Sequence, residues 1–400
     1  MKSTPRNPVQ GNPIGLGAVT PPNPRSVGDL PILSGKKSSR GTSSLTLSEG
    51  EELYVGVDCH KSSYSVSIFS VDRKAAIKQW KQDSEDDALV AALAPIRDHV
   101  RLIVYEAGPT GFHLARRLTS SGLATQVIAP SLTPRPSGRR EKSDRLDAAK
   151  LAEFASKGLL SPVAVPKVEE EGARDVLRLR QTSAKNLRRQ MVQIHALLLK
   201  HGVTPPENLE RWSIAAIREL QTLQMPSAGA TRALQLMVGE LLHLRSRTGD
   251  MTRSLSQVVK SPEYAERIER LRGIGGIGRL TAAAVVLELF QPERFERGEQ
   301  VAKYVGLSPC ICASGETVKQ EGRIPGGTPR LRELLIEGAW RWTRLDEGAG
   351  RRMAELTAKT GSKKKAIVAM ARRLLVVMWR MLVTGEPYLG FQRCNAKEAA

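Results

Sequence analysis

The chain has 400 residues, and its 61 Lys and Arg against 41 Asp and Glu give a formal net charge of +20. This length predicts two or three domains, each able to bury a core, and no run of 18 apolar residues predicts a transmembrane helix. So large a positive charge indicates a polyanionic partner. Nucleic acid is favoured over a membrane, because the chain shows no basic amphipathic helix with exposed aromatic residues.

The cysteine content favours a reduced, intracellular protein. Four cysteines are too few for a disulfide framework in a chain this long. The single Cys-x-Cys has no second pair, so it does not predict a zinc site. The first residues lack the apolar stretch of a secretory signal. We therefore expect a cytoplasmic, nucleoid-associated protein with free thiols at its four cysteines, Cys59, Cys310, Cys312 and Cys394.

The sequence begins with a segment, residues 1–50, that is rich in Pro, Ser, Thr and Gly and poor in large apolar side chains. Such a composition buries too little surface to offset its ordering entropy, so a disordered tail is expected. Its six Lys and Arg against two acids allow a weak electrostatic contact with nucleic acid. A second, short tail is expected over 391–400.

Residues 51–165 have the pattern of a mixed α/β domain, with strands first and helices interleaved later. Short apolar or alternating runs predict the strands, and amphipathic runs after turn residues predict the helices. The expected strands are 53–57, 63–70, 74–80, 101–105 and 125–128, and the expected helices are 84–96, 111–120 and 143–156.

Residues 166–260 have apolar residues at heptad spacing in two segments, which predicts an antiparallel coiled-coil arm that mediates self-association. A helical bundle inside one subunit would give the same pattern and stays open as the alternative. Either a dimer or a tetramer would fit. The seam residues are Leu177, Ala184, Leu187, Met191, Ile194 and Leu198 in the first segment, and Leu234, Met237, Leu241, Leu244, Met251, Leu255 and Val258 in the second.

Residues 261–390 are expected to form a second, mostly helical domain. It begins with a glycine-rich turn before an Ala-rich helix, a pattern typical of a helix-hairpin-helix element. Glycines such as Gly276 and Gly278 leave backbone N–H groups open to a DNA phosphate, although a turn of this kind is more often only a turn.

Four carboxylates are the candidate catalytic residues. Asp58 and Glu106 directly follow two predicted strands, and Asp144 and Asp147 share one face of a predicted helix. Each alone is more often a cap or a solvated surface residue, but together they would repel one another strongly without a cation between them. Oxygen ligands select Mg²⁺ or Mn²⁺, and such ions assist phosphodiester cleavage. Nearby cations that would suit a phosphate backbone are Arg139, Arg140, Lys142 and Arg145.

The motifs GVDCHK, YEAGPTG and KSDRLDAAKLAE resemble those of the DEDD insertion-sequence transposases, relatives of the Piv DNA invertase. The likeness continues in RGIGGIGRLTAAA, in YVGLSP and in the following Ala-Ser-Gly, and spans about residues 53–385. It implies a ribonuclease H-like, RuvC-type fold for 51–165 and a transposase domain over 261–390. It assigns the four acids as the metal-binding catalytic set.

The same resemblance implies that Ser314 is a nucleophile that forms a covalent link to DNA, although a serine in such a loop is ordinarily structural. It also implies a guide, or bridge, RNA that pairs with donor and target DNA. The Arg-containing helix after the serine, with Arg330 and Arg332, would add DNA contacts. The segment 323–327 departs from the family pattern, which more usually has a Lys-containing turn.

Three functions fit these features. The favoured one is a DNA transposase, or site-specific recombinase, that cleaves and exchanges strands through a serine-linked intermediate. A RuvC-like, junction-resolving endonuclease would use the same acids with metal-activated water and leave Ser314 structural. An architectural nucleic-acid-binding protein is disfavoured, because all four acids are present.

Overall fold

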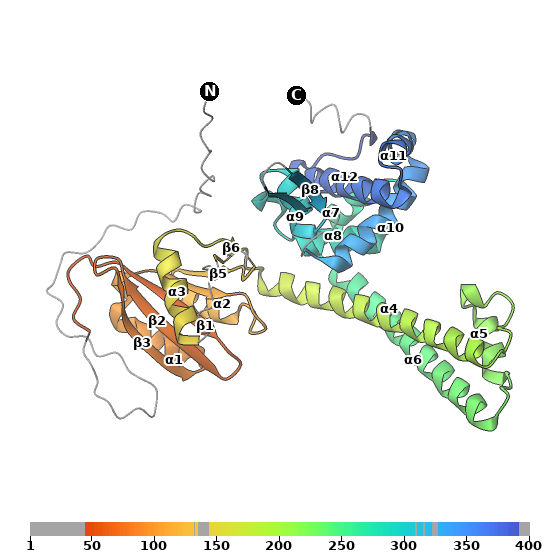
Figure 1. The fold of residues 1–400 in the computed structure, drawn as a ribbon, viewed down its shortest axis with the longest axis horizontal. Coiled ribbons are helices and arrows are strands. Elements are labelled where there is room, and N and C mark those ends of the chain that lie inside the picture. Colours follow the sequence, from red (N-terminus) through yellow and green to blue (C-terminus); the bar gives the residue numbers. More distant parts are fainter. Residues whose placement is uncertain are drawn as a thin grey trace. The chain divides into compact units, whose positions relative to one another are not determined.

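The computed structural model describes residues 45–131, 133–134, 144–308, 310–314, 317–321 and 327–391, with only the backbone described for 144–145, 310–314 and 317–321. The chain divides into two compact units, Met1–Val165 and Pro166–Ala400 (Figure 1). Most of the N-terminal tail and residues 392–400 of the C-terminal tail lie outside the described residues.

The first unit is built on a six-stranded sheet with the strand order β3-β2-β1-β4-β5-β6. β1, β2 and β3 form an antiparallel meander, β4 and β5 run parallel to β1, and β6 pairs antiparallel with β5. This mixed sheet with helices on both faces is the expected ribonuclease H-like fold. The strands are β1 Leu53–Cys59, β2 Ser63–Ser70, β3 Ala75–Asp83, β4 Val100–Glu106, β5 Thr125–Ile128 and β6 Pro162–Val163.

Helices cover both faces of this sheet because its central strands are apolar on both sides. Val55, Val57, Ile103 and Tyr105 are fully buried on the face that packs against α1 (Asp86–Leu93) and α2 (His113–Ser120). The opposite face packs against α3 (Asp144–Ser156). The helix expected over 84–96 divides at Pro95, where α1 gives way to a 3-10 turn, Ala94–His99.

The N-terminal end of the described chain packs on this domain. Leu47, which the composition places in the tail, is only 8% exposed and belongs to the core of the sheet. Glu51 is also buried, and its carboxylate accepts a hydrogen bond from Ser70 Oγ (2.6 Å) and pairs with Arg73 Nε (2.9 Å).

In the second unit, α4 (Val168–Lys200) and α6 (Ala228–Val258) pair as a long antiparallel hairpin, with α5 (Ile214–Thr222) at its tip (Figure 1). Seam residues such as Ile194, Leu198, Leu234 and Leu241 are buried within this single chain. The middle of the hairpin is polar. The heptad pattern places one polar residue, Thr248, in the second seam, but it does not predict the polar residues Ser183 and Gln190 of the first. There Ser183 Oγ lies 2.8 Å from Thr248 Oγ1, and Gln190 Nε2 donates to Met237 O (2.9 Å).

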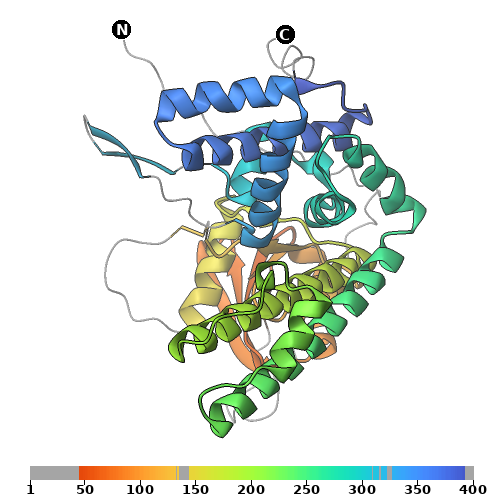
Figure 2. The same cartoon turned by 90° about the vertical axis from the view of Figure 1, so that its right-hand side faces the viewer.

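In the rest of the second unit, the described residues form helices and one β-hairpin, β7 with β8. Residues 282–289 of α8 are buried throughout, and together with α10 and α12 they form the main core. Figure 2 shows the two-stranded hairpin projecting from these helices. The elements are α7 Pro262–Arg272, α8 Arg279–Leu289, a 3-10 turn Pro292–Arg294, α9 Gly298–Val305, β7 Cys310–Ser314, β8 Thr317–Glu321, α10 Pro329–Leu345, α11 Glu347–Thr360 and α12 Lys363–Thr384.

A buried ion pair fastens the arm to this helical domain. Glu288 of α8 is 1% exposed, and its carboxylate pairs with Arg178 Nη2 (2.9 Å) and Arg174 Nη2 (3.3 Å) of α4. A carboxylate in such a site requires these partners, because an unpaired buried charge is strongly destabilising.

None of the helices that the structure describes combines the length and the apolar character of a transmembrane segment.

Candidate active site at the edge of the sheet

β1 and β4 each carry an acidic residue at the carboxyl end. In their parallel pairing Val57 lies opposite Tyr105, so the next residues, Asp58 and Glu106, are also neighbours. Adjacent strands lie about 4.8 Å apart and their side chains alternate between the faces in step. Both carboxylates therefore lie on the same face of the sheet, at its carboxyl edge.

α3 covers that same face and brings two more acids to it. A Cβ added at Gly56 would overlap Ala148 O and lie 2.6 Å from Ala152 N, so the helix rests directly on the backbone of β1. Asp147 and Asp144 lie in the first turn of α3, each one helical turn before a residue that packs on the sheet. The side chain of Asp144 lies outside the described residues.

The three described acids already have polar partners. Asp58 Oδ2 lies 3.2 Å from His60 Nε2, Thr133 Oγ1 donates to Glu106 Oε1 (3.0 Å), and Lys150 Nζ lies 3.3 Å from Asp147 Oδ1. The side chains of Asp58 and Asp147 are 24% and 35% exposed, so a substrate can reach them.

The donor set fits a hard divalent cation. It consists of carboxylate oxygens at one sheet edge, the ligands that Mg²⁺ and Mn²⁺ prefer, and it contains no thiolate. Among the described side chains, no group of three His, Cys, Asp or Glu is close enough to hold a metal ion.

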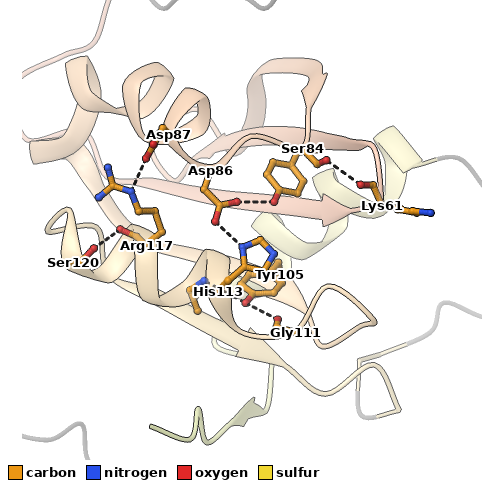
Figure 3. A network of polar contacts seen from close by, with 11 residues as sticks. Lys61, Ser84, Asp86, Asp87, Tyr105, Gly111, His113, Arg117 and Ser120 are labelled. Carbon is orange, nitrogen blue, oxygen red and sulfur yellow. Dashed lines mark hydrogen bonds and ion pairs between the residues drawn. The ribbon is translucent and has the colours of Figure 1, made fainter. Parts of the chain in front are cut away.

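On the other face of the same edge, a polar network links both covering helices (Figure 3). Asp86 of α1 accepts a hydrogen bond from Tyr64 Oη (2.7 Å) and lies 2.6 Å from His113 Nδ1 of α2. Tyr105 Oη donates to Gly111 O (3.2 Å) in the loop that follows Glu106. This network fixes the loop after the β4 acid.

Cys59 follows the β1 acid directly but is unsuited to act as a nucleophile. Burial, together with the negative charges of Asp58 and Asp86, raises the pKa of its thiol to about 12. The thiol therefore stays protonated and unreactive at neutral pH.

Ser314 is the last residue of β7 and lies opposite Thr317 of β8; its side chain lies outside the described residues. Contacts on either side of the hairpin hold its base together. Thr328 N donates to Val305 O (3.1 Å), and a Cβ on Gly327 would lie 2.5 Å from Gly306 N. The hairpin is thus anchored where α9 ends and α10 begins.

The two arginines expected to contact DNA both donate within the protein. Arg332 Nη1 donates to Gly306 O (3.0 Å), at the base of the serine hairpin, and Arg330 Nη1 donates to Arg178 O (3.0 Å) of the arm. Each guanidinium retains further donors. These two hydrogen bonds nevertheless link α10 to α4 and to the end of α9, so both arginines stabilise the fold. The remaining expected cations lie in part outside the described residues: Arg139, Arg140 and Lys142 entirely, and Arg145 in its side chain.

Gly276 and Gly278, two of the four glycines between α7 and α8, differ in their surroundings. Gly276 has a φ of +87°, and a Cβ there would lie 2.7 Å from Arg341 Cβ of α10. This glycine is therefore required for packing. Gly278 is exposed and has no atom within 4 Å of an added Cβ, so the first N–H groups of α8 after it remain open.

Comparison with known proteins decides the family. A DEDD transposase model of the IS110 type matches residues 55–202, and a model described as "Transposase IS116/IS110/IS902 family" matches residues 268–354. A putative transposase, y4qE, of Sinorhizobium fredii is 30% identical over 345 residues, covering 85% of this chain and 84% of that protein. The chain belongs to the IS116/IS110/IS902 family of transposases.

Two further comparisons are with a second transposase and with a solved structure. The transposase of insertion sequence element IS1111A from Coxiella burnetii is 29% identical over 305 residues, covering 74% of this transposase and 80% of its relative. A solved structure, T. thermophilus RuvC in complex with a Holliday junction substrate, aligns with 12% identity and a TM-score of 0.21, over 28% of this chain and 99% of that one.

The close approach of α3 to β1 gives a testable stability prediction for the transposase. Gly56→Ala should destabilise the first unit by about 1–3 kcal/mol or more, since the new methyl group must displace the backbone of α3. DNA cleavage should fall as well, because the helix carries two of the acids. Thermal unfolding followed by circular dichroism measures the first effect. Gly158→Ala, where nothing lies within 4 Å but φ is positive, is a control for glycine loss alone. An unfolding midpoint equal to that of the wild type would contradict the packing argument.

Proposed function

We propose that this transposase cleaves and rejoins DNA strands with the four acids at the sheet edge as its metal-dependent catalytic set. The observation that carries the proposal is the parallel register of β1 and β4, which makes Asp58 and Glu106 neighbours beneath the helix with Asp144 and Asp147. When bound by these carboxylates, Mg²⁺ or Mn²⁺ would stabilise negative charge on the phosphate and on the leaving oxygen. The role of the four acids would be to hold that cation at the edge of the sheet.

We further propose that Ser314 forms the covalent link to DNA. Its Oγ would lose a proton and bond to phosphorus while one phosphorus–oxygen bond of the DNA breaks, and the released DNA hydroxyl would gain a proton. The serine-linked phosphodiester conserves the bond energy, so attack by another DNA hydroxyl can rejoin strands without an external energy source. The position of Ser314 at the end of β7, on an anchored hairpin, supports this role.

The direct test is incubation of the purified transposase with its element's end sequences, Mg²⁺ and co-purified RNA. Denaturing gels should show strand cleavage and a DNA species of reduced mobility that protease digestion removes. Metal-dependent nicking with no protein-linked DNA would instead support the junction-resolving endonuclease, in which activated water replaces the serine.

A guide RNA and self-association complete the proposal. The net charge of +20 suits an RNA partner as well as DNA. Exchange between two duplexes requires more than one active site, so we propose a dimer or tetramer, which mass photometry can measure. The seam of α4 and α6 is filled within one chain, so a dimer contact must use other surfaces of the arm.

Binding to nucleic acid should depend steeply on salt. Because positive side chains release counterions from phosphates, affinity for duplex DNA should fall by orders of magnitude between about 50 and 200 mM salt. Fluorescence anisotropy with a labelled duplex at several salt concentrations measures the slope. An essentially flat titration would contradict an electrostatic DNA interface.

A further inference from the structure

The helical domain contains a groove that the proposed chemistry does not use. It has a volume of about 830 Å³ and lies between the segment at the start of α9 and the second half of α12, with Phe391 at one side. The acids, Ser314 and the glycine hairpin are not among its lining residues. Its size is within the range of pockets that hold small organic ligands.

Arginine side chains make the groove cationic. Arg297, Arg372, Arg373 and Arg380 line it, against two acids, Glu296 and Glu299. Arg372 Nη2 lies 3.7 Å from Glu299 Oε1, a long ion pair on an exposed carboxylate. Neither Arg297 nor Arg380 forms an ion pair with any side chain that the structure describes. The groove therefore presents a surplus of positive charge and two arginines that no described acid engages.

The surface between these arginines is apolar. Arg372, Val376, Arg380 and Val383 recur at spacings of four, four and three along α12, so cationic and apolar side chains alternate on one face of the helix. Trp379 lines the same groove, is 9% exposed, and is held by a hydrogen bond from Nε1 to Pro292 O (2.8 Å).

The N-terminus of α9 packs closely against this face of α12. A Cβ on Gly298 would lie 2.8 Å from Val376 Cγ1, so glycine allows α9 to begin directly beside α12. Val376, Trp379 and Val383 of α12 form the apolar floor of the groove. The first N–H groups of an eight-residue helix thus border the same groove, where the helix dipole adds to the positive potential.

We propose that this groove binds unpaired nucleotides of a DNA strand. An unstacked base presents an apolar face that suits Val376, Val383 and the edge of Trp379, and its flanking phosphates match the unengaged arginines. In a paired duplex the base faces are stacked on one another, so they cannot contact the apolar floor. The proposal rests on the proposed function, because strand exchange by the transposase is what would supply unpaired DNA.

The test removes the two arginines that have no ion-pair partner. Arg297→Ala with Arg380→Ala should weaken binding of a labelled single-stranded oligothymidylate about tenfold or more and reduce the salt slope by about 1.4, as for two lost phosphate contacts. Arg211→Ala with Arg218→Ala, two exposed arginines near the tip of the arm, removes the same charge elsewhere and should leave both values close to wild type. Fluorescence anisotropy measures affinity, and thermal unfolding confirms that each variant is folded.

A second variant tests the apolar floor. Val383 is 42% exposed, so both Val383→Glu and Val383→Leu should fold normally. Val383→Glu should weaken single-strand binding, whereas Val383→Leu should leave it unchanged.

Equal single-strand affinities of the double-arginine variant and its control would overturn the proposal. So would a loss of the same size on a fully paired duplex, which would identify an ordinary backbone-binding surface. Loss of self-association with unchanged DNA binding would identify a protein contact. Because these assays measure binding without cleavage, a failure of the proposed catalytic function leaves their outcome unaffected.

Discussion

Alanine at any one of Asp58, Glu106, Asp144 and Asp147 should lower the rate of DNA strand cleavage at least about 100-fold and leave the fold intact. In the proposed function each acid would hold the cation that stabilises negative charge in the transition state, so the loss of one carboxylate would weaken that stabilisation. The described acids, Asp58, Glu106 and Asp147, are partly exposed and none supports the core, so their loss should change stability little. Cleavage of labelled end DNA at saturating Mg²⁺ measures the rate.

A control for this series is Asp72→Ala, which removes an exposed acid from the turn between β2 and β3 of the same domain. It should cleave at the wild-type rate. Full activity of Asp144→Ala with normal Mg²⁺ dependence would contradict the catalytic assignment of the acids.

Ser314→Ala should abolish strand exchange while DNA binding and metal dependence of binding stay unchanged. The proposed nucleophile is one atom, the serine Oγ, which alanine lacks. Ser314→Cys should retain weak activity with an altered metal preference, because a thiolate attacks phosphorus poorly. Recombination between donor and target plasmids measures the exchange, and anisotropy measures the binding.

The matched control is Ser308→Ala, which removes the hydroxyl of a half-buried serine just before the hairpin. It should recombine like the wild type. If Ser314→Ala recombines at the wild-type rate, the serine is structural and water is the nucleophile.

The sequence predicts the domain with the sheet well because its signals are local. β2 and β5 have the expected bounds, since alternating side chains end there at turn residues. β6 was not predicted, because two residues carry no periodicity and only pairing with β5 makes them a strand. The hairpin of β7 and β8 was also missed within a region expected to be helical, although its β-branched residues around Gly315 were a usable signal.

The acids of the candidate site could be named from the sequence, but their surroundings could not. The residue spacing places Asp58 and Glu106 at strand ends, and only the register of β1 with β4 makes them neighbours. The contact of Thr133 with Glu106 depends on tertiary packing. His60, two residues after Asp58, and Lys150, three residues after Asp147, are local neighbours that could have been noticed in the sequence.

Glycine and arginine motifs were harder to interpret. Gly276 resembles a phosphate-binding glycine in sequence, yet its backbone conformation and the contact with α10 account for it. Likewise, Arg332 lies in a basic helix that suggests DNA contact, and it donates to a carbonyl at the end of α9. Motif residues of both types serve packing and binding, and only the tertiary contacts separate the two uses.

The most direct measurement is identification of the residue that becomes attached to DNA. The transposase is incubated with nicked end DNA, Mg²⁺ and co-purified RNA, denatured with heat and detergent, and digested for mass spectrometry. Our account predicts a nucleotide adduct on the peptide containing Ser314, absent from Ser314→Ala and from Asp58→Ala. An adduct on a tyrosine, or hydrolytic nicking without any adduct, would contradict it.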